Sequence, residues 1–160
     1  MDYSQSEYKE SENRLFESLT QNVSIHGIMN LASEATGNPV YFLDPNLRLV
    51  SFSSNLNVKS PIWSKLTEKE YVDNPSIIDS IKKYDVNQSG NVIRFAMPNS
   101  KHSIMQSFII INNKLVGFLG LCDLLVPFTE DDVKYMAYLQ KILQICLCKN
   151  QFYQNIKSPD

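Results

Sequence analysis

The chain has 160 residues, of which 43% are hydrophobic, 20% charged and 11% aromatic. This length fits one domain, and the composition is typical of a packed globular protein rather than a disordered one. The formal net charge is −2, and basic residues do not cluster beyond the pair Lys82-Lys83. The sequence therefore lacks the basic footprint of a nucleic-acid-binding protein, and we expect no direct nucleic-acid contact.

Targeting signals and cysteines favour a reduced, cytoplasmic setting. The N-terminal segment is polar and acidic, unlike a secretory signal peptide. The most apolar region, 108–128, is interrupted by polar residues such as Asp123, so it lacks the roughly 18 uninterrupted apolar residues of a membrane span. Cys122, Cys146 and Cys148 are too few and too clustered for a disulfide framework.

Two helices are expected at the N-terminus. A partial apolar stripe predicts the first at about 7–21. Ser24 can cap a second helix, which runs to about Thr36 with apolar residues at helical spacing. Gly37 suits the left-handed residue that ends a helix, and Pro39 prevents its continuation.

Two antiparallel strands should follow, at Val40–Leu43 and Leu47–Phe52. They flank Asp44-Pro45-Asn46, which is composed of turn-forming residues. The next stretch, Ser60 to Asp85, is helical in pieces, and its second piece begins at Asn74-Pro75.

A further turn, Asn87 to Asn91, leads into a third strand at Val92–Met97. Strands at Ser103–Ile111 and Lys114–Leu121 then form a hairpin. Its Asn112-Asn113 turn tolerates the left-handed backbone of a tight connection.

The last helix should begin after Thr129, which is its predicted N-cap and precedes three acidic residues. It could run to about Gln154, roughly twice the usual helix length. The order of elements predicts an α+β fold: an antiparallel sheet of five or six strands, with helices mainly on one face and a long C-terminal helix.

Several short motifs in this order carry a family resemblance. They are Leu31-Ala32-Ser33-Glu34, Gly37-Asn38-Pro39-Val40, Phe42-Leu43-Asp44, Ser51-Phe52-Ser53, the hairpin Phe108–Leu121 with Lys114-Leu115-Val116-Gly117, and Phe128-Thr129-Glu130-Asp131-Asp132. From about Ser24 to Gln154 the chain resembles a GAF domain of the GAF/PAS superfamily, particularly the N-terminal sensor of PucR-like bacterial transcription regulators.

The resemblance implies a pocket between one sheet face and the helical insert, closing over a small metabolite. It also implies a homodimer formed through the terminal helices and a downstream output domain. Residues 1–23 would then be an N-terminal, dimerising helix, and 24–160 the sensory domain. The chain departs from the regulators in that no helix-turn-helix follows the long helix, so we expect either a sensor piece of a longer protein or a domain that works alone.

Eight residues around the insert are candidates for binding the ligand. Five aromatic residues could wall an apolar cavity and three polar residues could orient its occupant: Tyr41, Phe52, Trp63, Tyr71, Phe95, and Ser53, Arg94, Gln106. An arginine in an apolar strand can pair bidentately with a carboxylate or phosphate. The alternatives are that Arg94 lies on a solvated sheet face and that Trp63 only packs in the core.

The long helix carries two apolar stripes. Tyr138, Ile142, Ile145 and Phe152 make one, and Met136, Leu143 and Leu147 make the other. One stripe can cover the sheet while the second meets a partner subunit, so Met136, Leu143 and Leu147 are the predicted dimer interface. The alternative is a single broad buried face in a monomer.

Catalytic patterns are absent from the sequence. His26 and His102 stand in no metal-ligand spacing, and Cys146 and Cys148 point to different helix faces. Free methionine-R-sulfoxide reductase is a GAF-fold enzyme that uses cysteines, but its chemistry needs thiols around the pocket. The sequence thus predicts a non-enzymatic sensory domain with no metal and no cofactor. The alternative is a ligand-free dimerisation or protein-interaction module.

Overall fold

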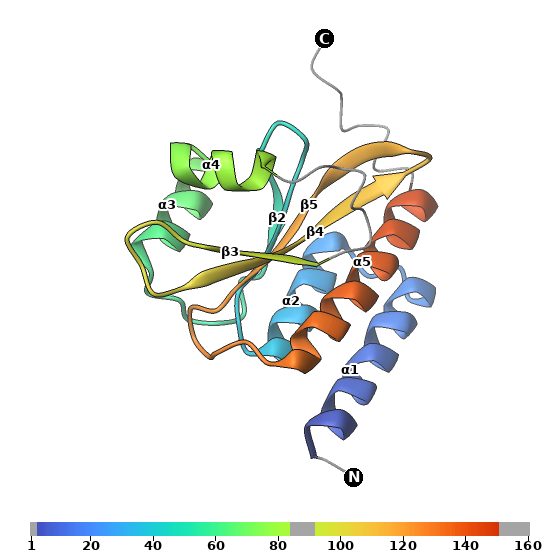
Figure 1. Ribbon diagram of the computed structural model, residues 1–160. Helices are drawn as coiled ribbons and strands as arrows, with labels where there is room; N and C mark the ends of the chain where they lie inside the picture. The colour runs from blue at the N-terminus through green and yellow to red at the C-terminus, as the bar shows by residue number, and fades with distance from the viewer. Residues whose placement is uncertain (1–2, 84–91, 151–160) are drawn as a thin grey trace.

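The computed structural model describes residues 3–83 and 92–150, which form a single sheet with helices on both sides (Figure 1). The elements in chain order are α1 Tyr3–Thr20, α2 Ile25–Thr36, β1 Val40–Leu43, β2 Leu49–Phe52, α3 Pro61–Lys69, α4 Pro75–Lys82, β3 Ile93–Ala96, β4 Ser103–Ile111, β5 Lys114–Cys122 and α5 Glu130–Asn150. The predicted order of helices and strands is therefore confirmed for the described residues.

The sheet has five strands in the order β2-β1-β5-β4-β3, and every pairing is antiparallel. The hairpin β4–β5 forms its centre, and the pair β1–β2 adds to the free edge of β5. The α+β fold with an antiparallel sheet and a long C-terminal helix is thus confirmed.

Alternating residues of the strands divide the core into two layers. In β4, Met105 and Ile109 pack in the cluster that α2 and α5 share, whereas Ile104 and Phe108 pack in the cluster formed with α3 and α4. Helix α1 lies on the outer side of α2 and α5 (Figure 1). Among the described residues, the short helices α3 and α4 cover the opposite face, so the helical insert makes a second, thinner layer.

The caps of α2 and the turn of the central hairpin form where the sequence predicts them. The Ser24 hydroxyl accepts the backbone N–H of Gly27, and Gly37 ends α2 with φ 74°. Asn112 and Asn113 take φ values of 53° and 63°, as a two-residue turn between antiparallel strands requires.

Strand β2 begins two residues later than expected. Leu47 has φ 64° and donates its N–H to the carbonyl of Asp44, so it belongs to the turn. The Asp44 carboxylate also accepts the N–H groups of Asn46 and Arg48, which tightens that turn. The predicted turn at 87–91 and the predicted helix end near residue 154 lie outside the described residues.

Helix α5 buries more than one side within the single chain. Met136, Leu143 and Leu147, the predicted dimer interface, are 0% exposed in the core cluster that includes α1, α2 and the sheet. They do not form a free surface, because α1 covers the side of α5 that the sheet leaves open. The large exposed apolar side chains of α5 are instead Val133 and Ile145. None of the described helices is long and apolar enough to cross a membrane.

Candidate functional site

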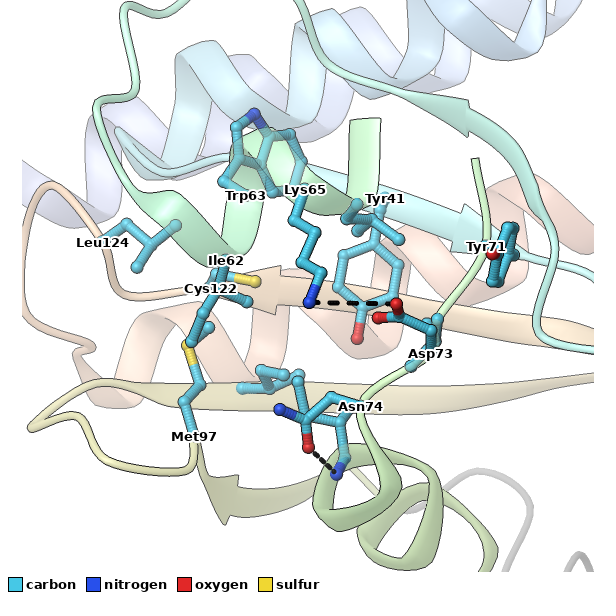
Figure 2. A pocket seen from close by; sticks show the side chains of 14 residues that line it. Tyr41, Ile62, Trp63, Lys65, Tyr71, Asp73, Asn74, Met97, Cys122 and Leu124 are labelled. Atoms are coloured by element: carbon cyan, nitrogen blue, oxygen red, sulfur yellow. Dashed lines mark hydrogen bonds and ion pairs between the residues drawn. The ribbon is translucent and has the colours of Figure 1, made fainter. Parts of the chain in front are cut away.

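A cavity of about 70 Å³ lies between the sheet and the insert (Figure 2). Its lining comes from β1, α3, the α3–α4 connection, α4 and the ends of β4 and β5: Tyr41, Ile62, Trp63, Lys65, Leu66, Tyr71, Val72, Asp73, Asn74, Ile77, Met97, Ile104, Cys122 and Leu124. A water molecule needs roughly 15 Å³ counted in this way, so the space corresponds to roughly five waters.

Helix α3 forms the wall because of its local sequence. The Ser60 hydroxyl accepts the N–H of Trp63, and Pro61 occupies the first turn, where its missing N–H costs nothing. Ile62 and Leu66, four residues apart, then point to the same side of the helix. Both of them line the cavity.

The connection after α3 is held against the edge of the sheet. Glu70 ends α3 with φ 64°, and its carbonyl accepts the N–H of Leu49. The N–H of Val72 donates to the carbonyl of Leu47. These bonds fix the chain just before Asp73 and Asn74, which lie at the polar side of the cavity (Figure 2).

A glycine makes room for the aromatic floor. Gly120 of β5 is the neighbour of Tyr41 in β1, and a Cβ at Gly120 would lie only 2.1 Å from the Tyr41 ring. The ring therefore lies directly across Gly120, which only a residue without a side chain permits. Burial raises the pKa of the Tyr41 hydroxyl well above its usual value, so this hydroxyl stays protonated.

Three charged side chains gather at the polar side of the cavity. The Lys69 ammonium lies 2.6 Å from the Asp73 carboxylate, and the Lys65 ammonium lies 3.8 Å from the same oxygen. The hydrogen bond from Lys69 holds the pKa of Asp73 below its usual value, so the carboxylate stays ionised. Only Lys65 and Asp73 of these three line the cavity.

The expected ligand-binding residues divide into distinct groups. Tyr41, Trp63 and Tyr71 line the cavity. Phe52 packs edge-on against Trp63, with ring centroids 6.2 Å apart, and Phe95 is buried in the same cluster, so both support the wall from behind. The Ser53 hydroxyl does not face the cavity, because it accepts the N–H of Val40 at the edge of β1.

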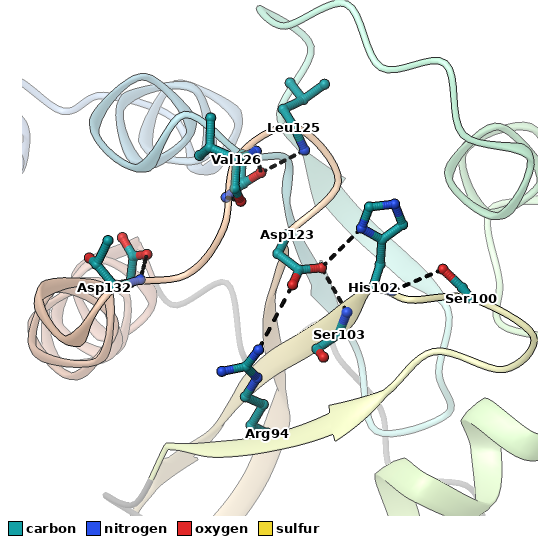
Figure 3. A network of polar contacts seen from close by, with 10 residues as sticks. Arg94, Ser100, His102, Ser103, Asp123, Leu125, Val126 and Asp132 are labelled. Carbon is teal, nitrogen blue, oxygen red and sulfur yellow. Dashed lines mark hydrogen bonds and ion pairs between the residues drawn. The ribbon is translucent and has the colours of Figure 1, made fainter.

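Arg94 lies on the opposite face of the sheet. Phe95 packs toward the cavity side, and alternation along β3 sends Arg94 the other way. Its guanidinium lies 5.1 Å from the centre of the Phe128 ring and 4.0 Å from the Asp123 carboxylate, with 59% of the side chain exposed (Figure 3). Arg94 is therefore part of a surface network and does not reach the cavity.

Gln106 is buried on the cavity side without hydrogen bonds. It lies opposite Gly120, next to the ring of Tyr41, and is 0% exposed. Neither its amide nitrogen nor its amide oxygen has a partner among the described residues. An unpaired buried polar group costs about 1–3 kcal/mol, so we expect this amide to lower the stability of the fold.

Gln106→Met is therefore expected to raise the free energy of unfolding by about 1–3 kcal/mol, since methionine keeps the shape and removes both unpaired atoms. Urea unfolding monitored by circular dichroism measures the change. The matched control is Gln140→Met, because Gln140 is also buried but donates to the Phe108 carbonyl at 2.6 Å. The control is expected to lower stability, and a Gln106 variant that is equally destabilised would show that its amide is paired in solution.

The sequence alone missed most of the cavity lining. The amphipathic spacing of Ile62, Leu66 and Ile77 could have indicated part of the lining, because each belongs to the apolar side of a short helix, α3 or α4. Lys65 and Asp73 gave no signal, since single charges in a polar segment are ordinarily solvated. Cys122 is buried in the cavity wall, and burial raises its pKa, so this thiol is not an activated nucleophile.

Polar contacts also hold the loop between β5 and α5, next to the cavity (Figure 3). Cys122 and Leu124 line the cavity, and the side chain of Asp123 between them accepts the N–H of Ser103 at 2.7 Å and lies 3.4 Å from Nδ1 of His102. Asp123 therefore anchors the start of the loop from β5 to α5, between two residues that line the cavity.

The same loop is fixed again two residues later. The buried amide of Asn38 accepts the N–H groups of Leu125 and Val126 and donates to the carbonyl of Val126. At the start of α5 the Asp132 carboxylate accepts the N–H of Thr129 and the hydroxyl of Tyr8. Side chains therefore anchor this segment at three separate places between the cavity wall and the first turn of α5, and the last of them, Asp132, also contacts α1.

The described residues contain no group of three or more histidine, cysteine or acidic side chains that could hold a metal ion. His26 forms a local surface network: its Nδ1 lies 2.9 Å from the carbonyl oxygen of Phe52 and its Nε2 lies 3.0 Å from the Ser54 hydroxyl. Cys146 is buried in the helical layer and Cys148 is exposed, so only one of the three thiols lies at the cavity.

Solved structures provide the comparison for this geometry. A GAF domain of a phosphoenolpyruvate-protein phosphotransferase from Acinetobacter is 15% identical, with a TM-score of 0.51 and all of both chains covered. A GAF domain of a putative sensor histidine kinase from Pseudomonas syringae pv. tomato is 12% identical, with a TM-score of 0.58 over 97% of this chain and 99% of that one. This chain has a GAF fold.

A third similar structure is the cofactor-binding GAF domain of the nutrient sensor CodY from Clostridium difficile. It is 12% identical, with a TM-score of 0.50 over 82% of this chain and 92% of that one. No protein-family model and no curated protein matches the sequence. At these identities the comparison establishes the GAF fold alone, and the role of the cavity has to be argued from its own residues.

Proposed function

We propose that this chain is a sensory, regulatory domain that binds a small metabolite in the cavity beneath α3 and α4. The observation that carries the proposal is the cavity itself: apolar side chains enclose it, and a few polar groups lie at one side, as in ligand sites generally. The GAF fold of sensory proteins such as the histidine kinase and CodY is consistent with this role.

Occupancy would be relayed through the loop from β5 to α5. A ligand shifts a conformational equilibrium only if it binds one arrangement better than the other. Leu124 contacts the cavity, and the adjoining residues are held by Asp123 and Asn38 just before α5 begins. A ligand that moves Leu124 would therefore change the anchoring of α5, and through Tyr8 and Asp132 that of α1.

The proposal includes a cytoplasmic location, a homodimer and an output domain of the kind that PucR-like regulators carry. The dimer would use the outer faces of α1 and α5, where Phe16 and Ile145 are more than half exposed. These two side chains replace the buried stripe that the sequence suggested.

Trp63 makes the proposal directly testable, because it is the single tryptophan of the chain and lines the cavity. We would titrate the purified domain with amino acids, purines, nucleotides and short organic acids, measuring tryptophan fluorescence and thermal unfolding. A saturable fluorescence change together with a rise in melting temperature is expected for a ligand that binds the folded state. If no compound of the four classes changes either the fluorescence or the melting temperature, the ligand-free dimerisation module is favoured.

A further inference from the structure

The chemistry of the cavity narrows the class of ligand, provided that the proposed sensory function holds. The aliphatic part of its wall includes Ile62, Leu66, Ile77, Met97, Ile104 and Leu124. These residues offer a ligand dispersion contacts and no hydrogen bonds. The cavity has room for roughly five water molecules. A space of this size suits a short hydrocarbon group and is too small for a nucleotide or a system of several fused rings.

The group formed by Lys65, Lys69 and Asp73 has one positive charge in excess, and Lys65 and Asp73 are its members that line the cavity. Asp73 is already neutralised by Lys69 at 2.6 Å, and this hydrogen bond raises the pKa of Lys69 and lowers that of Asp73. Lys65 lies 3.8 Å from the same carboxylate oxygen, beyond hydrogen-bond distance. Its ammonium group therefore keeps its donors for another acceptor, and Figure 2 shows it extending toward the polar side of the cavity.

Two neutral donors accompany Lys65. The Tyr41 hydroxyl stays protonated because of its burial, and no described residue hydrogen-bonds to it. The Asn74 side-chain oxygen is occupied by the N–H groups of Ser76 and Ile77 at the start of α4, which leaves the amide nitrogen of Asn74 as the free end. Lys65, Tyr41 and Asn74 thus present donors from α3, β1 and the α4 cap to a single space.

An anion that only accepts hydrogen bonds fits this set of donors. We propose that the cavity binds a small aliphatic monocarboxylate, whose carboxylate is held by Lys65, Tyr41 and Asn74 while its short hydrocarbon chain fills the apolar cavity. Charge-assisted hydrogen bonds of this kind are stronger than those between neutral groups, so the carboxylate is the dominant recognition element.

Three probes of nearly equal shape separate the charge types. Isobutyrate is anionic, isobutyramide neutral and isobutylamine cationic, and each is titrated against Trp63 fluorescence and melting temperature. We expect isobutyrate to bind about tenfold or more tightly than the other two. Equal or tighter binding of the amide or the amine would overturn the carboxylate assignment while supporting the sensory function.

Two substitutions at the polar side of the cavity are expected to change the affinity for isobutyrate in opposite directions. Lys65→Met is expected to weaken isobutyrate binding about tenfold to a hundredfold, because a hydrogen bond to a charged group is lost. Asp73→Asn is expected to strengthen it, because a negative charge next to Lys65 is removed. Lys82→Met removes the same charge from an exposed position on α4 that does not line the cavity, and it should leave the affinity unchanged.

The variants also distinguish a wrong ligand class from a wrong sensory function. Melting temperatures of the unliganded variants verify that each remains folded before its affinity is interpreted. Unchanged isobutyrate affinity in Lys65→Met, or weaker binding in Asp73→Asn, overturns the assignment of Lys65 as the carboxylate partner. Absence of a response to all three probes and to the four metabolite classes would instead overturn the sensory function itself.

Discussion

Leu143→Ala is expected to lower the free energy of unfolding by about 2–5 kcal/mol, the usual cost of truncating a fully buried leucine. Leu143 is 0% exposed and packs in the cluster where α5 meets the sheet, α1 and α2, so truncation leaves a cavity that rigid neighbours fill only in part. The loss is a large fraction of the total stability of a typical domain. Urea unfolding followed by circular dichroism measures it.

The control for Leu143 is two residues away on the same helix. Ile145 is 51% exposed, and Ile145→Ala is expected to change stability by less than about 0.5 kcal/mol. In the proposed dimer, Ile145→Glu places a charge in the interface and should yield a folded monomer by light scattering. Comparable destabilisation by the two alanine variants would contradict the burial of Leu143, and a dimeric Ile145→Glu would place the subunit interface elsewhere.

Asn38→Ala is expected to cost about 2–4 kcal/mol, because it leaves three backbone groups of the β5–α5 loop without their partner. Those groups are the N–H of Leu125 and both the N–H and carbonyl of Val126. Faster hydrogen exchange at these two amides would report the loosened loop directly.

The comparison variant for Asn38 is Asn55→Ala. Asn55 is exposed, and its side chain donates a single bond, to the Asn30 carbonyl, so the expected loss is below about 0.5 kcal/mol. If Asn38→Ala leaves both stability and amide exchange unchanged, the loop is not anchored by this side chain. The proposed route from the cavity to α5 would then lose its main fixed point.

Local sequence was sufficient to predict most helices and strands. Ser24 with Gly37 bounds α2, and Asn112-Asn113 turns the central hairpin, because these residues act on the backbone within a few positions. The start of β2 was misplaced, since the left-handed conformation of Leu47 depends on the hydrogen bonds of the preceding Asp44 turn.

The residues of the site were less predictable than the fold. Alternation along a strand shows which residues share a face of the sheet, but not which of the two faces borders the cavity. The apolar context of Arg94 suggested a ligand contact, but the side chain faces Phe128 and Asp123 on the other side of the sheet. Lys65 does line the cavity, but the polar sequence around it gave no indication of a ligand contact.

The sequence by itself determined the order of helices and strands, because caps, turns and periodicity are local properties. Tertiary structure decided what each apolar stripe contacts. It buried Met136, Leu143 and Leu147 by laying α1 over α5, and it formed the cavity by setting the ring of Tyr41 across Gly120. These outcomes depend on contacts between segments far apart in the chain, which no local pattern encodes.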